Sequence, residues 1–182
     1  YSNIAEGNRF DRTIVFAPRG VIFDKNNIPI AWNETGTLLR HTKEGTIEPL
    51  SFPARTYTQE PGFAHIVGYV RQPEVDDKGF FWRTDTTGET GIEKIYNAQL
   101  SGTNGYKIAE NDVSGDTINS HLTQVPIVGK NLTLTIDAKL QSEMSRELGR
   151  VVDSSGYGGG AAIVMDIHTG EVLVMTSYPE FD

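Results

Sequence analysis

The amino-acid sequence predicts an α+β fold that is rich in strands over its first two thirds and then has one long helix and a β-hairpin. Three observations predict this fold. Short β-branched runs between residues 13 and 33 are separated by proline, glycine and asparagine, as strands are by turns. Apolar residues recur at three- and four-residue intervals from Ala138 to Val152, as on one face of a helix. Two short apolar runs, at 161–165 and 172–175, predict the hairpin.

The front half of the chain is predicted to be mostly extended. Asn27 lies in a turn between two strands and tolerates a left-handed backbone. Residues 34–54 have no clear pattern, and residues 106–127 are polar and are expected to form one or two strands with a turn at 114–116.

One helix is predicted in the front half. Thr90 and Glu93 have the spacing of a capping box, and Gly102 is expected to end the helix. Its predicted apolar face consists of Ile92, Ile95, Tyr96 and Leu100.

The last third begins with a predicted strand, because Leu132, Leu134 and Ile136 alternate with polar residues. Asp137 is the predicted N-cap of the long helix, which is expected to end at Ser154-Ser155-Gly156. Gln141 is expected to point away from the apolar face of this helix.

The composition excludes several classes of function. At 182 residues, 37% of them hydrophobic, the chain has the size and character of one globular domain or slightly more. The net charge of −8 argues against nucleic acid and anionic lipid as partners, because both are bound mainly by clustered Lys and Arg. The absence of cysteine excludes disulfides and Cys-ligated zinc. Because Tyr1 is not a natural first residue, we expect a further segment upstream.

The last third resembles the opening of the transpeptidase domain of penicillin-binding proteins. The resemblance rests on three motifs in the expected order, TID-x-x-LQ, D-x-x-TGE and S-x-P-x-FD, within LTLTIDAKLQ and GGAAIVMDIHTGEVLVMTSYPEFD. It implies that residues 132–182 are the incomplete start of a transpeptidase domain with a serine β-lactamase-like fold.

The first two thirds are similar to the pedestal, or dimerisation domain, of class B penicillin-binding proteins. The matching segments are P-R-G-x-I-x-D-x-N, R-x-Y, A-H-x-x-G-Y-V and G-x-x-G-x-E-x-x-Y-x-x-x-L-x-G-x-x-G. The resemblance implies that residues 1–131 form an elongated, non-catalytic pedestal.

Three charged residues, Arg19, Arg55 and Glu93, lie on these front motifs, and the resemblance implies that they meet in a structural polar network of the pedestal. Such pairing would fix the relative orientation of the segments that carry the charges. The alternative is that each is a solvated surface charge.

Catalytic residues are not expected in this chain. The chemistry of the family requires S-x-x-K, S-x-N and K-T-G elements, and the sequence contains none of them. The expectation is therefore a fragment, not itself an enzyme, that ends before the catalytic serine. The resemblance implies a full-length parent that is a serine D,D-transpeptidase acting on peptidoglycan stem peptides and acylated by β-lactams.

The resemblance also implies a location and partners. The parent is expected at the outer face of the cytoplasmic membrane, anchored by an N-terminal transmembrane helix that this sequence lacks. A cell-wall glycosyltransferase or scaffold protein is the expected partner of the pedestal, which would position the active site.

No cofactor or metal is expected. The four histidines do not have H-x-x-H or H-E-x-x-H spacing. Asp112, Ser114 and Asp116 imitate the first ligands of a calcium loop, but Thr123 stands where a late glutamate is required, which favours a plain turn.

The alternative function is a free-standing secreted protein-interaction module without transpeptidase activity, which would have a compact, complete core. The pedestal interpretation predicts instead an unpaired edge at the 161–177 hairpin and a partly uncovered apolar face on the helix at 138–152.

Overall fold

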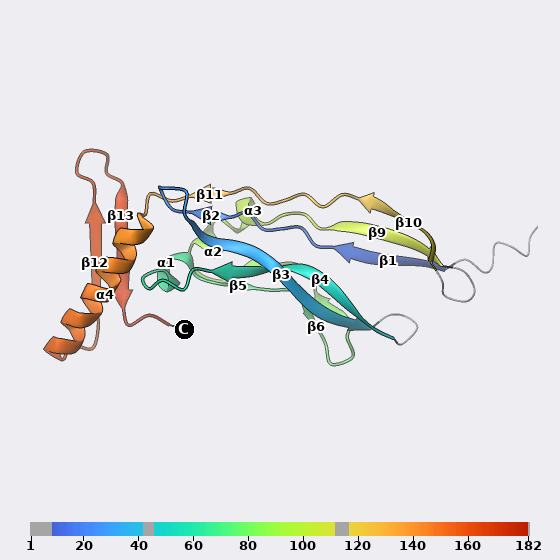
Figure 1. The fold of residues 1–182 in the computed structure, drawn as a ribbon, viewed down its shortest axis with the longest axis horizontal. Helices are drawn as coiled ribbons and strands as arrows, with labels where there is room; N and C mark the ends of the chain where they lie inside the picture. The colour runs from blue at the N-terminus through green and yellow to red at the C-terminus, as the bar shows by residue number, and fades with distance from the viewer. Residues whose placement is uncertain (1–8, 42–45, 112–116, 182) are drawn as a thin grey trace, which may run out of the picture.

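The computed structural model describes residues 9–41, 46–111 and 117–181. Figure 1 shows an elongated molecule whose longer strands lie along the long axis, with one long helix and a hairpin standing across one end. The turn predicted at 114–116 lies outside the described residues, as do Asp112, Ser114 and Asp116, which imitate the first ligands of a calcium loop.

One sheet has three antiparallel strands in the order β1-β9-β10. Its strands are β1 (Arg9–Val15), β9 (Gly105–Asn111) and β10 (Thr117–Gln124). The last two confirm the prediction of extended structure after the front helix. Because β1 pairs with β9, the sheet joins the two ends of the front two thirds.

A second sheet has the order β11-β2-β3-β4. Its strands are β2 (Ile22–Phe23), β3 (Pro29–His41), β4 (Ile47–Tyr57) and β11 (Leu132–Thr133). β11 runs parallel to β2, whereas β3 and β4 form a long antiparallel hairpin from Ala31 and Tyr57 to His41 and Ile47. The residues 34–54, which showed no pattern, therefore lie mostly in the longest hairpin of the described structure.

The outer edge of β4 is poor in backbone donors. The N–H of Arg55 points away from β3, because it donates to the side chain of Gln72. Backbone direction alternates along a strand, so the nitrogens of Pro53 and Pro49 face the same outer side. Proline has no N–H to offer, and these two residues therefore protect the edge against pairing with another strand.

Short elements connect the two sheets. They are α1 (Ala64–Val67), β5 (Val70–Arg71), β6 (Glu74–Val75), β7 (Phe81–Arg83), β8 (Thr87–Gly88), α2 (Gly91–Ile95) and α3 (Asn97–Leu100). β5 pairs with β8, and β6 pairs with β7. Gly79, between β6 and β7, accepts a hydrogen bond from the backbone of His41, so this small hairpin contacts the end of β3.

The prediction of one capped helix ending at Gly102 was wrong. The structure has two short helices, α2 and α3, and Thr90 occupies the N-cap position without a side-chain cap. The carboxylate of Glu93 is bound by arginines instead. Leu100 is fully buried, as predicted for the apolar face. Ile95 is 76% exposed and therefore does not belong to that face.

The main apolar core lies where the second sheet, α1, α3 and the start of the long helix meet. Its buried residues are Ile22, Ile30, Ala31, Phe63, Val67, Leu100 and Ile136. The core therefore includes Ile136, which immediately precedes the N-cap of the long helix, and it links the two parts of the chain.

The predicted long helix and hairpin are confirmed as α4 (Ala138–Ser155), β12 (Gly160–Met165) and β13 (Val172–Tyr178). The side chain of Asp137 accepts a hydrogen bond from Leu140 N at 3.0 Å, as an N-cap does. Gly156, with a φ of 72°, ends the helix in the left-handed conformation.

One face of the hairpin packs on α4, and the other is open. Ile163 and Met175 are cross-strand partners and are 63% and 47% exposed. Within the described residues β12 pairs with β13 alone. Val151 on α4 is 56% exposed. The predicted unpaired edge and uncovered apolar residues are therefore both present.

Asp137→Ala is expected to lower the free energy of unfolding by about 0.5–2 kcal/mol at neutral pH, because the helix loses its cap. The hydrogen bond from Leu140 lowers the pKa of Asp137, and one from Asn26 adds to this. The cap therefore stabilises the fold above the unfolded pKa of about 3.9, and its contribution is lost as the pH falls through the lower folded value.

Chemical denaturation across this acidic range measures the effect. The deficit of Asp137→Ala relative to the original chain should shrink as the pH falls. Asp137→Asn is the control, because it keeps a neutral acceptor. A deficit that stays constant with pH would show that the carboxylate is not the capping group.

Candidate functional site

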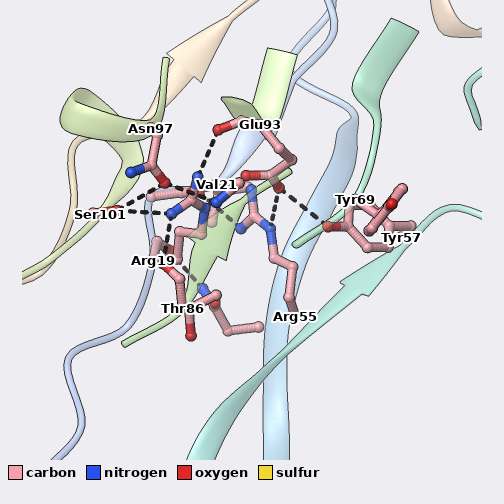
Figure 2. Close-up of polar contacts among 12 residues, drawn as sticks. Arg19, Val21, Arg55, Tyr57, Tyr69, Thr86, Glu93, Asn97 and Ser101 are labelled. Carbon is pink, nitrogen blue, oxygen red and sulfur yellow. Dashed lines mark hydrogen bonds and ion pairs between the residues drawn. The ribbon is translucent and has the colours of Figure 1, made fainter. Parts of the chain in front are cut away.

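The structure brings Arg19, Arg55 and Glu93 together in the front two thirds of the chain (Figure 2). Arg19 Nε lies 2.6 Å from Glu93 Oε2, and Arg55 Nε lies 2.6 Å from Glu93 Oε1. Glu93 is fully buried, and the two arginines are 3% and 5% exposed. The network thus joins α2 to β4 and to the segment between β1 and β2.

Close backbone contacts set the positions of the three side chains. Gly20 N donates to Leu100 O at 2.8 Å, which fixes the segment of Arg19 against α3. A Cβ on Gly20 would lie 2.0 Å from Lys130 O, and one on Gly88 would lie 2.0 Å from Glu93 O. Only glycine fits such approaches, which explains why these motif positions are glycines.

Most of the remaining donors of the arginines bind main-chain and hydroxyl oxygens, whereas Arg55 Nη2 is buried without a hydrogen-bond partner among the described residues. Arg19 Nη1 donates to Ser101 Oγ at 2.8 Å and to Thr86 O at 3.2 Å, and its Nη2 donates to Glu93 O at 2.9 Å. Arg55 Nη1 donates to Gly20 O at 2.8 Å. Ser101 in turn donates to Asn97 Oδ1. The network therefore holds carbonyls of three segments as well as the carboxylate.

A neutral phenol, that of Tyr57, lies beside the ion network. Tyr57 Oη lies 3.5 Å from Glu93 Oε1. Burial and the nearby Glu93 carboxylate raise the pKa of Tyr57. The phenol therefore keeps its proton and donates a hydrogen bond to the carboxylate. Burial lowers the pKa of Arg19, and the attraction of Glu93 opposes this shift.

The contacts of this network are ion pairs and hydrogen bonds between chain segments. Both oxygens of Glu93 accept from guanidinium groups, and the network contains no nucleophile paired with a base. Among the residues that the structure describes, no group of three or more His, Asp or Glu is arranged to hold a metal ion. No helix in the described ranges has the length and apolar character needed to cross a membrane.

Sequence reasoning missed a second polar centre, at Asp24. This carboxylate is fully buried. Its Oδ1 accepts from Asn26 N and Ile28 N, at 2.8 and 2.7 Å, and its Oδ2 accepts from Ala138 N at 3.0 Å. Asp24 therefore ties the turn between β2 and β3 to the start of α4. The Asp of the P-R-G-x-I-x-D motif was the available signal.

Asn27, in the same turn, has the expected left-handed conformation, with a φ of 63°.

Gln141 was also misplaced by the sequence pattern. It was expected to point away from the packed face of α4, yet it is fully buried. Its amide donates to Met175 O at 2.7 Å and accepts from Met175 N at 2.9 Å. A polar side chain that pairs with a strand in this way gives no apolar periodicity to detect.

Glu93→Ala is expected to lower the free energy of unfolding by roughly 3–5 kcal/mol, because it leaves two buried guanidinium groups without their counterion. The matched control is Glu89→Ala, which removes a carboxylate of a more exposed pair, 3.3 Å from Arg71. A change of about 0–1 kcal/mol is expected for the control. Urea denaturation measures both, and equal losses would show that Glu93 behaves as a surface charge.

Comparisons with known proteins agree with the expected family. Residues 46–134 match the family model described as "Penicillin-binding Protein dimerisation domain". The peptidoglycan D,D-transpeptidase MrdA of Acinetobacter baumannii is 33% identical over 134 residues, which cover 70% of this chain and 19% of MrdA. The peptidoglycan D,D-transpeptidase FtsI of Escherichia coli is 30% identical over 128 residues, or 70% of this chain and 20% of FtsI. The chain thus spans about a fifth of the length of these relatives.

Solved structures share the fold. Penicillin-binding protein 2X from Streptococcus thermophilus superposes with a TM-score of 0.72 at 20% identity, covering 94% of this chain and 36% of that protein. Penicillin-binding protein 3 from Mycobacterium tuberculosis, solved with aztreonam, gives a TM-score of 0.61 at 25% identity, with 93% and 30% covered. Residues 46–134 therefore match the dimerisation domain of penicillin-binding proteins, and the chain has the fold of solved penicillin-binding proteins.

Proposed function

We propose that this chain is the pedestal of a serine D,D-transpeptidase that crosslinks peptidoglycan stem peptides, and that it positions the catalytic domain and binds a partner protein. The observation that carries the proposal is the buried network of Arg19, Arg55 and Glu93. Charges buried in one favourable arrangement fix the relative orientation of the segments that carry them, as a positioning element requires.

The shape of the molecule supports a spacer. Figure 1 shows β1, β9, β10 and the β3–β4 hairpin extending along the long axis, away from the end formed by α4, β12 and β13. In the proposed parent, the catalytic domain continues the end with α4 and the hairpin. The opposite end then lies toward the outer face of the cytoplasmic membrane, where an N-terminal helix anchors the parent.

The chemistry takes place outside these residues. The sequence contains no S-x-x-K, S-x-N or K-T-G element, and these elements supply the nucleophile, the base and the carboxylate anchor in this family. The relatives MrdA and FtsI are named peptidoglycan D,D-transpeptidases. We therefore assign the acyl-enzyme chemistry, and acylation by β-lactams, to the remainder of the parent protein.

The partner surface is proposed at the far end of the β3–β4 hairpin. Leu39 and Ile47 are 60% and 59% exposed there. Exposed apolar side chains of this size favour protein contacts. Because the prolines along β4 have no backbone N–H, a partner would bind here through side-chain contacts rather than by pairing with the strand. The partner is a cell-wall glycosyltransferase or a scaffold protein, as expected from the resemblance.

Labelling with a fluorescent penicillin tests the enzymatic part of the proposal. The 182-residue chain should remain unlabelled, and the parent extended beyond Asp182 should be acylated. Boiling the parent before labelling is the control for specific acylation. A parent that carries no penicillin-reactive serine would instead favour the secreted interaction module without transpeptidase activity.

Leu39→Glu tests the partner surface. Co-purification of the parent with its purified glycosyltransferase should be lost, while acylation by penicillin is retained, because Leu39 lies on the exposed hairpin. The control is Ile95→Glu, since Ile95 is an equally apolar residue that is 76% exposed on α2. If both variants retain the glycosyltransferase, the hairpin is not the contact surface.

A further inference from the structure

Two motifs that lie far apart in the sequence meet in the structure. One is A-H-x-x-G-Y, which includes His65 and Tyr69, and the other is S-x-P-x-F, which includes Ser177 and Phe181. His65 Nδ1 and Ser177 Oγ share a hydrogen bond at 2.8 Å. The ring of Phe181 lies edge-on to His65 at 4.9 Å and to Tyr69 at 6.3 Å between centroids. The two motifs therefore form one joint between α1 and the end of β13.

Glu180 makes the second contact of this joint. Its carboxylate oxygens accept from Gly62 N at 2.7 Å and from Ala64 N at 3.1 Å. Gly62 has a φ of 99°, and a Cβ there would lie 3.0 Å from the Cβ of Ser145. The backbone at 62–64 is therefore presented in one conformation to a carboxylate from the C-terminal part.

Gln141 makes the third contact. In addition to its pair of hydrogen bonds with Met175, its amide nitrogen donates to Gly62 O. Gln141 therefore binds β13 and the loop before α1 at once. Figure 1 shows α1 beside α4 and β13, so the three contacts lie in one region.

The chain itself crosses between the two parts at residues 134–138. There Thr135 Oγ1 donates to Val172 O at 2.7 Å, and Asp137 N donates to Leu173 O at 3.0 Å. The buried carboxylate of Asp24 holds Ala138 N. This crossing is tied by covalent bonds and by a fully buried carboxylate, whereas the joint at α1 has non-covalent contacts alone.

We propose that these two connections are a hinge and a clasp. The hinge is residues 134–138 with Asp24. The clasp is Gly62, Ala64 and His65 on one side, with Gln141, Ser177, Glu180 and Phe181 on the other. The closed clasp fixes the orientation of the α4–β12–β13 unit on the front two thirds of the chain, and its opening lets this unit rotate about the hinge. If the proposed function holds, that orientation is the one between pedestal and catalytic domain.

The clasp is the weaker connection for a physical reason. When it opens, Gln141 keeps both hydrogen bonds to Met175 and loses the one to Gly62. The Glu180 carboxylate and the His65 ring, which is already exposed, exchange their protein partners for water. Opening at the hinge would instead uncover Asp24, which is fully buried and satisfied. The hydrogen bonds of the clasp are therefore exchanged for water more readily than those of Asp24 at the hinge.

Distance measurements between two spin labels test the clasp. The chain has no cysteine, so Thr37→Cys and Ser154→Cys, both at exposed positions on β3 and α4, give one labelled pair. The original sequence should show a single narrow distance distribution. Glu180→Ala should broaden the distribution or shift part of it to a second distance, with unchanged far-ultraviolet circular dichroism. Gln141→Leu should do the same.

The control is Glu147→Ala, which removes an exposed carboxylate of α4 that pairs with Arg150 on the same helix. It should leave the distribution narrow. If Gln141→Leu does not fold, Glu180→Ala still decides the outcome. An unchanged distribution in Glu180→Ala, or equal broadening in the control, would overturn the proposal. The measurement uses neither penicillin nor a partner protein, so failure of the clasp and failure of the proposed function are separate results.

Discussion

The burial of one carboxylate between two guanidinium groups constrains the rest of the front structure. Glu93 has no contact with solvent, and Arg19 and Arg55 have almost none. Charges in such a position stabilise the fold only when every partner is in place. The segment before β2, the base of β4 and the start of α2 must therefore adopt one relative arrangement, and Gly20 and Gly88 allow the backbone to approach closely enough. The apolar core lies beside this network, since Leu100 of the core accepts a hydrogen bond from Gly20, next to Arg19.

The polar centres are arranged in sequence along the molecule. The network around Glu93 lies in the front two thirds, Asp24 lies at the junction with α4, and Gln141 lies on α4 against β13. Each of them binds backbone groups from segments far apart in the chain. Backbone groups at such junctions have no regular strand or helix partner, so side chains must satisfy them. This explains why the junction between the two parts depends on buried polar residues rather than on apolar area alone.

The elements predicted correctly from the sequence are those whose apolar residues recur at regular intervals. The helix α4, its cap at Asp137 and the hairpin β12–β13 followed from apolar spacing and end signals. The hairpin β3–β4 was missed because its environment changes along its length: Arg55 is buried near the base, whereas Leu39 is exposed near the tip. The supposed capping box at Thr90 failed because the carboxylate of Glu93 has stronger partners in the arginines. The three charged residues were singled out by their motifs, since spacing alone does not bring residues 19, 55 and 93 together.

The pairing of β1 with β9 has a consequence for how the chain folds. Val15 pairs with Gly105, and Ile22 pairs in parallel with Leu132. Such long separations make loop closure slow, because the entropy of the intervening chain is lost before the contacts form. During synthesis β1 must remain without its partner until the segment after α3 has emerged, whereas β2 can pair with β3 at once. Until β9 pairs with it, β1 exposes the backbone N–H and C=O groups that the sheet later satisfies, as an unpaired edge strand does.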